Sequence, residues 1–91
     1  MYNNQIYYTI TESNILENDT IATQNYTFMD KNKAAAKLYS LWAYAADLPE
    51  GATSQCMSVY MTEHRHDRNI MLESKVFDYR ESEPIPEPET T

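Results

Sequence analysis

With 91 residues, 42% of them hydrophobic, the chain is long enough for one small domain around a single core. Its net charge of −7, from 14 acidic and 7 basic residues, argues against direct binding to nucleic-acid phosphates, which bind clustered Lys and Arg. The single Gly51 excludes a glycine-rich phosphate loop, and the lone Cys56 excludes an internal disulfide. The start of the sequence lacks the pattern of a secretory signal, and no stretch has the ~18 apolar residues of a membrane span. We therefore expect a cytoplasmic protein without a membrane segment.

The first two predicted elements are strands that pair as a hairpin. Residues 5–12 alternate between two sets of side chains, which is the period-two pattern of a half-buried strand. One set contains Ile6, Tyr8 and Ile10, and the other contains Tyr7, Thr9 and Thr11. The polar residues 13–19 predict a loop. Residues 20–29 are rich in β-branched and aromatic side chains and predict the second strand.

A helix is predicted after Asp30, which is a good N-cap residue. Apolar side chains recur at helical spacing over residues 31–48 and form a stripe that packs on the core. The stripe consists of Ala34, Leu38, Leu41, Trp42, Ala45 and Leu48. The sequence LPEG then ends the helix. We expect Trp42 to be buried, so its truncation should be among the most destabilising single changes.

Two further strands are predicted after the helix. Residues 54–62 place Met57, Val59 and Met61 inward by alternation. Residues 69–80 form the fourth strand, for which we expect one inward set and one outward set. The inward set is Ile70, Leu72 and Val76, and the outward set is Phe77 and Tyr79. Residues 81–91 contain three prolines and four glutamates, which predict a disordered or extended acidic tail.

The predicted fold is therefore a single α+β domain over residues 1–80, followed by the Pro-rich tail at 81–91. Its element order is β-β-α-β-β, with a four-stranded, mainly antiparallel sheet and one helix on one face. One helix cannot cover both faces, so the outer face remains open. We expect that face to present Tyr7, Thr9, Thr11, Cys56, Ser58, Tyr60 and Thr62. Such a polar and aromatic surface is typical of partner contacts, and also of an ordinary solvated sheet.

The stretch TEHRHDRN, residues 62–69, is the densest in chemically active side chains. In an extended chain His64 and His66 point to the same side, which suits two imidazoles on one zinc ion. Cys56 lies eight residues before His64 and is about 26 Å away along a strand, too far to share that ion. A zinc site needs at least three protein ligands, so we predict no metal and no cofactor. A metal-binding protein that uses His64 and His66 remains an alternative.

The same stretch shows no catalytic set, because no serine or cysteine can be placed beside its histidines. A polar hairpin turn explains its composition more simply. In such a turn Arg65 and Arg68 pair with Glu63 or Asp67. We therefore predict a protein that is not an enzyme.

Acidic residues concentrate at the two ends of the chain. Residues 1–30 hold four acidic residues and no Lys or Arg, residues 81–91 hold four glutamates, and the segment between them is close to neutral. By size, charge and layout rather than by a sequence motif, the chain resembles small acidic phage-encoded anti-defence proteins, including anti-CRISPR inhibitors of RNA-guided nucleases. The resemblance implies a protein-binding inhibitor, encoded by a phage or mobile element. Such an inhibitor binds a basic partner, such as a nucleic-acid-binding nuclease, and blocks nucleic-acid access or a conformational step.

The expected partner-binding residues combine acidic side chains of the first hairpin with tyrosines of the open face. They are Glu12, Glu17, Asp19, Tyr7 and Tyr60. Two alternatives stay open beside the metal-binding one. The first is a structural or regulatory module that self-associates through an exposed edge strand. The second is an RNA-binding sheet with exposed tyrosines, against which the negative charge argues.

Overall fold

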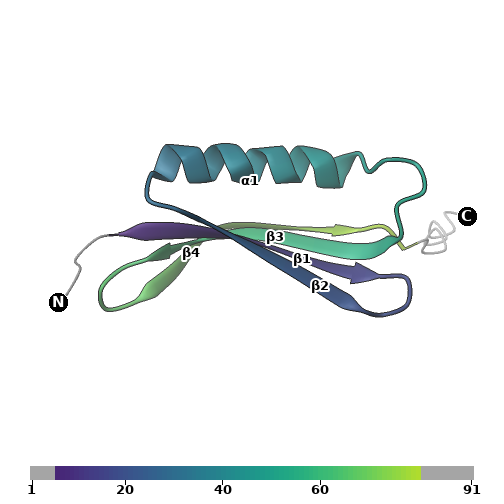
Figure 1. The fold of residues 1–91 in the computed structure, drawn as a ribbon, viewed down its shortest axis with the longest axis horizontal. Coiled ribbons are helices and arrows are strands. Elements are labelled where there is room, and N and C mark those ends of the chain that lie inside the picture. The colour runs from purple at the N-terminus through teal and green to yellow at the C-terminus, as the bar shows by residue number, and fades with distance from the viewer. Residues whose placement is uncertain (1–5, 81–91) are drawn as a thin grey trace, which may run out of the picture.

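The computed structural model describes residues 6–80, which form a four-stranded antiparallel sheet with one helix across one face (Figure 1). The elements are β1 (Tyr7–Leu16), β2 (Ile21–Phe28), α1 (Lys31–Ala46), β3 (Ser54–His64) and β4 (Asn69–Asp78). The α+β class and the β-β-α-β-β order are therefore confirmed. The predicted tail at 81–91 lies outside the described residues. Within 6–80, no helix has the length and apolar character needed to cross a membrane.

The strands lie in the order β2-β1-β3-β4, so β1 and β3 are central and β2 and β4 are the edges. The central position explains why β1 is longer than predicted. Ser13–Leu16 were expected in a loop, but β1 pairs with β2 as far as Ile15 and with β3 as far as Leu16. Hydrogen bonding to neighbours on both sides keeps this polar segment extended.

The core lies between α1 and the side of the sheet that α1 covers. Its buried apolar residues are Ile10, Ala34, Leu38, Leu41, Ala45, Met57, Val59 and Met61. Four residues of the predicted helical stripe and the inward residues of β3 are thus confirmed in the core, whereas Trp42 and Leu48 are half-buried against it. Helix α1 starts at the predicted cap, where the Asp30 carboxylate accepts a hydrogen bond from the Asn32 amide at 2.8 Å.

Trp42 was expected in the buried core but lies at its margin, half-buried. Its indole N–H donates to the Val59 carbonyl at 3.2 Å. The Lys75 ammonium lies 4.7 Å above the ring, and Tyr39 contacts it at a tilt. The ring therefore covers the edge of the core under a lysine side chain.

The predicted faces of β4 were wrong for Val76, Phe77 and Tyr79. Phe77 pairs with the buried Met57, so it faces α1, while Val76 is 64% exposed on the other face. The cause is a β-bulge in which Met61 pairs with Glu73 and Thr62 pairs with Met71. The extra residue between them shifts the alternation of every later side chain to the opposite face.

Successive elements alternate in direction, so two connections and one strand end lie at the same end of the molecule. They are the β1–β2 turn, the α1–β3 loop and the end of β4 (Figure 1). The Glu17 amide donates to the Thr53 carbonyl at 2.8 Å, and the Tyr79 amide donates to the Gln55 carbonyl at 2.9 Å. The Tyr79 hydroxyl donates to the carbonyl of Ala45. Segments far apart in the chain are thereby joined at this end.

Candidate functional site

Charged side chains are distributed unevenly between the two ends of the molecule. The end with the β1–β2 turn is called the acidic end. Its one basic residue among those described is Arg80, and its five carboxylates belong to Glu17, Asp19, Asp47, Glu50 and Asp78. The opposite end has five basic residues against four acidic ones. They are Lys31, Lys33, Lys37, Arg65 and Arg68, with Asp30, Glu63, Asp67 and Glu73.

The β1–β2 turn holds the exposed Glu17 and Asp19 in one geometry. Asp19 has a φ of 66°, a left-handed conformation that Asp tolerates better than most residues. The Gln55 side-chain amide donates to the Asp19 carboxylate at 2.9 Å and to the Leu16 carbonyl at 2.8 Å. A hollow open to solvent beside the turn is lined by Leu16, Glu17, Asn18 and Thr53. The acidic turn is therefore braced by β3 rather than free to move alone.

Asp47, Glu50 and Asp78 were not among the residues predicted from the sequence. Asp47 caps the C-terminus of α1, and Glu50 follows in the exposed α1–β3 loop. The signal that would have found them is the connectivity. A helix that returns over a hairpin must end beside the turn of that hairpin, so the loop after it adds its carboxylates to those of the turn.

Asp78 is held ionised by Arg80, which contacts it through both backbone and side chain. The Arg80 Nε donates to the Asp78 carboxylate at 2.8 Å. Hydrogen bonds from the Arg80 side chain and amide lower the pKa of Asp78 to about 2. This carboxylate therefore keeps its negative charge throughout the physiological pH range.

Glu12 was predicted to act with Glu17 and Asp19, but the fold separates it from them. It lies half-buried in the middle of β1, where it pairs with Val59 on the side of the sheet that α1 covers. The turn residues lie beyond the end of β1. The structure therefore brings Glu17 and Asp19 together and does not place Glu12 with them.

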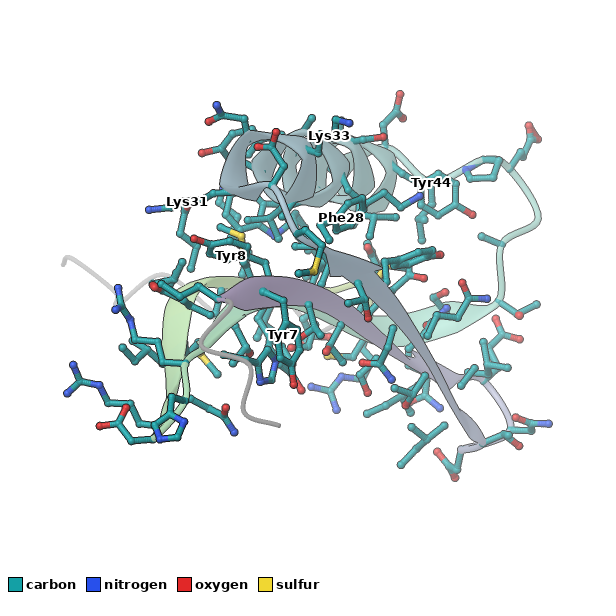
Figure 2. All side chains as sticks on the ribbon, turned by 60° about the vertical axis from the view of Figure 1, so that its left-hand side comes forward. Tyr7, Tyr8, Phe28, Lys31, Lys33 and Tyr44 are labelled. Atoms are coloured by element: carbon teal, nitrogen blue, oxygen red, sulfur yellow. The ribbon has the colours of Figure 1, made fainter. Side chains whose placement is uncertain are left out.

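Tyr7 and Tyr60 both lie on the open face of the sheet, the face away from α1. Figure 2 shows Tyr7 on that side, with Tyr8 and Phe28 on the side of the helix. Among the described strand residues of this face, Asp78 at the end of β4 is the one with a carboxylate. Most of the others have hydroxyl or amide side chains, including Tyr7, Thr9, Thr11, Ser13, Thr23, Asn25, Thr27, Ser58, Tyr60 and Thr62. The open face predicted from the sequence is thus confirmed, and it borders the acidic end at Asp78.

His64 ends β3 on the open face, where both ring nitrogens have hydrogen-bond partners. Nε2 lies 2.8 Å from the Thr9 hydroxyl and Nδ1 lies 2.9 Å from the Asn69 side-chain oxygen. The ring stacks on Tyr7 with centroids 4.5 Å apart. Metal binding through either nitrogen would require one of these hydrogen bonds to break. His64 therefore serves here as a half-buried connection between β1 and β3.

The turn at residues 65–68 confirms the predicted ion pairs. Arg65 contacts the buried Glu63 at 2.8 Å, and Arg68 approaches Asp67 at 4.0 Å. His66 lies exposed in this turn. In the part of the chain that the structure describes, no three His, Cys, Asp or Glu side chains are grouped so that they could hold a metal ion.

No protein-family model, no curated protein and no solved structure matches the chain. Its function is therefore inferred from the charges, exposure and contacts of the described residues.

Proposed function

We propose that the chain is a non-enzymatic inhibitor in the cytoplasm that binds a basic, nucleic-acid-handling protein through its acidic end. The observation that carries this proposal is the grouping of five carboxylates from three separate segments at one end of the fold. Arg80 is paired with Asp78 and offsets one of these charges, so this end has a net negative field that a groove lined with Lys and Arg would attract. Such complementarity speeds association and favours basic over acidic partners.

Among the charges of α1 that oppose the stability of the helix, Asp47 lies at the acidic end and supports its role in binding, whereas Lys31 and Lys33 lie at the opposite end. Lys31 and Lys33 occupy its first turn and Asp47 is its C-cap. The helix macrodipole favours acidic residues at the N-terminus and basic ones at the C-terminus, so each of these charges costs about 0.3–1 kcal/mol. Residues that break a local stability rule concentrate at functional sites.

The mechanism that follows is competition for a nucleic-acid groove. Phosphates and carboxylates both seek the guanidinium and ammonium groups that line it. The braced β1–β2 turn enters such a groove with little loss of conformational entropy, because its backbone is already bonded to β3. This role corresponds to the phage- or mobile-element-encoded anti-CRISPR type of inhibitor that the chain resembles in size, charge and layout.

The first experiment is a pull-down with the full chain from the organism that encodes it, or from the viral host, followed by binding kinetics on the purified partner. Glu17→Lys with Glu50→Lys adds four positive charges at the acidic end. Asp67→Lys with Glu73→Lys adds the same charge at the opposite end and is the matched control. The acidic-end variant should associate at least tenfold more slowly at low salt, and the control less than about twofold more slowly.

High salt should reduce the difference between the two variants. At 1 M the Debye length is about 3 Å, so the steering field is screened. A short DNA or RNA that the partner binds should also compete with the chain. If both variants slow equally, or if nucleic acid and chain bind the partner together, the acidic end is not the docking surface.

A further inference from the structure

The two edges of the sheet differ in how well they are protected against pairing with another strand. Edge strand β2, with the sequence IATQNYTF, contains no charged residue and no proline. Its register with β1 runs from Ile15↔Ile21 to Tyr8↔Phe28 without a bulge. Most of its side chains are exposed, and Ile21 is 63% exposed. A regular, uncharged edge of this kind offers unpaired N–H and C=O groups at every second residue.

The other edge, β4, has the features that prevent pairing. It carries Glu73, Lys75 and Asp78, and its bulge interrupts the regular ladder opposite Met61 and Thr62. Charged residues and bulges are the usual protections of edge strands. The molecule thus has one edge open to pairing and one edge closed to it.

We propose that two copies of the chain pair antiparallel through their β2 edges, which joins the four strands of each copy into one continuous sheet. The two-fold axis passes near Asn25, perpendicular to the sheet, so that Thr23 of one copy lies opposite Thr27 of the other. Both α1 helices then lie on the same side. The outer edges of the joined sheet are the two β4 strands, which stops growth at the dimer.

The charges near the two ends of β2 favour antiparallel pairing with a second copy, although each copy has a net charge of −7. Lys31 and Lys33 begin α1, which starts directly after the C-terminal end of β2. The Lys37 ammonium, farther along the helix, lies 4.3 Å above the Tyr26 ring of β2. Glu17 and Asp19 precede the other end of β2. Antiparallel pairing therefore sets the acidic turn of each copy beside the lysines of the other, whereas parallel pairing would set the two acidic turns together.

Self-association is measured on the full chain by sedimentation equilibrium, over about 1 μM to 1 mM. The average mass should rise with concentration from 10.6 kDa towards twice that value and no further. Thr23→Lys with Thr27→Lys sets like charges opposite one another across the new pairing and should weaken dimerisation at least tenfold. The matched control, Ser74→Lys with Val76→Lys, adds the same charge at the β4 edge and should dimerise within about threefold of the original chain.

A charge exchange tests the orientation. Lys31→Glu with Lys33→Gln gives one variant, and Glu17→Lys with Asp19→Asn gives the other, each changing the net charge by three. Each variant alone should dimerise less than the original chain at low salt. An equal mixture should form heterodimers in preference to either homodimer, because both junctions of the mixed pair then join opposite charges. The first variant places an acid at the helix N-terminus, so lost folding cannot explain its weaker association.

Hydrogen exchange provides a readout without substitution. Alternate β2 amides should gain protection as concentration rises, while β4 amides should not. A chain that stays monomeric at every concentration would overturn the proposal. So would a dimer that the β4 variant disrupts and the β2 variant does not, or a charge-exchanged mixture with no preference for heterodimers. This proposal does not depend on the proposed function, because it is tested without any partner protein.

Discussion

At the scale of single residues, burial rather than size decides which side chains hold the fold together. Leu38 is completely buried between α1 and the sheet, whereas the larger Trp42 is half-buried at the margin of the core. Trp42 contributes a hydrogen bond to Val59 and a contact with the Lys75 ammonium. Water reaches part of its ring, so its removal leaves a smaller cavity than the area of the ring suggests.

We therefore expect Leu38→Ala to cost more stability than Trp42→Ala. The leucine change should lower the free energy of unfolding by about 3–5 kcal/mol, and the tryptophan change by about 1–3 kcal/mol. Urea denaturation followed by circular dichroism measures both without a tryptophan signal. The opposite order would place Trp42 in the core, as its position in the helical stripe predicted.

A second prediction concerns the Asp78 carboxyl, which should titrate near pH 2 in the native protein. Its pKa is below the ordinary value of 3.8, so its stabilising contribution is present above pH 3.8 and is lost as the pH falls towards 2. Carboxyl chemical shifts measured by NMR against pH will show this. Arg80→Ala should return the pKa towards 3.8, whereas Arg68→Ala at the opposite end should not. A low pKa that survives Arg80→Ala would assign it to another cause.

At the scale of elements, β4 shows how one extra residue changes the face of a whole strand segment. The sequence and the structure agree on the half-buried Ile70, which precedes the bulge, and on the half-buried Leu72, which is its extra residue. After the bulge the aromatic residues that face α1 are Phe77 and Tyr79, and Lys75 lies on the same face. The Tyr79 hydroxyl donates to the Ala45 carbonyl, and burial is the main cause that raises its pKa. The bulge therefore gives α1 its aromatic contacts with the edge of the sheet.

Because of the bulge, we expect substitutions at two neighbouring residues to differ strongly in their effect on stability. Phe77→Ala should lower the free energy of unfolding by about 1–3 kcal/mol, because the ring packs against the core. Val76→Thr should change it by about 0.5 kcal/mol or less, because Val76 faces solvent. Chemical denaturation of both variants tests this. A larger loss at Val76 would restore the alternation expected without a bulge.

At the scale of the whole molecule, the fold separates the charges of the described residues into an acidic end and a more basic end. Carboxylates from the β1–β2 turn, the α1–β3 loop and the end of β4 gather at one end, and the lysines of α1 lie at the other. Like charges at the acidic end repel one another, and Asp47 also opposes the helix macrodipole. Both proposals use this polarity, one towards a basic partner and the other towards a second copy.

We expect Asp47→Asn to stabilise the protein at low salt. The change removes the repulsion between Asp47 and the other carboxylates, and also its unfavourable interaction with the helix macrodipole. It should raise the free energy of unfolding by about 0.3–1 kcal/mol, with a smaller gain at 1 M salt. Asp67→Asn is the control, because Asp67 lies beside Arg68 at the opposite end and its neutralisation should bring no gain. Thermal unfolding at low and high salt measures both. Equal gains for the two variants would contradict the charge polarity.

Local patterns in the sequence were sufficient for the types and order of the elements, most of the α1 stripe and the faces of β1 and β3. Each of these depends on side-chain periodicity within one segment, which reads correctly when no residue interrupts the alternation. The outer face with Tyr7 and Tyr60 follows from the same periodicity. Asp30 likewise marked the start of α1, because N-capping needs only neighbouring residues.

Tertiary structure alone decided the features that depend on residues distant in the chain. Pairing with β3 extended β1 through a polar segment, and the bulge against β3 turned Phe77 inward. The strand order left β2 as an edge, and the extension of β1 to Leu16 separated Glu12 from Glu17. Asp47 and Glu50 joined the acidic end because the helix returns over the hairpin. These outcomes arise from hydrogen bonds and packing between elements, and such contacts form only when the whole chain has folded.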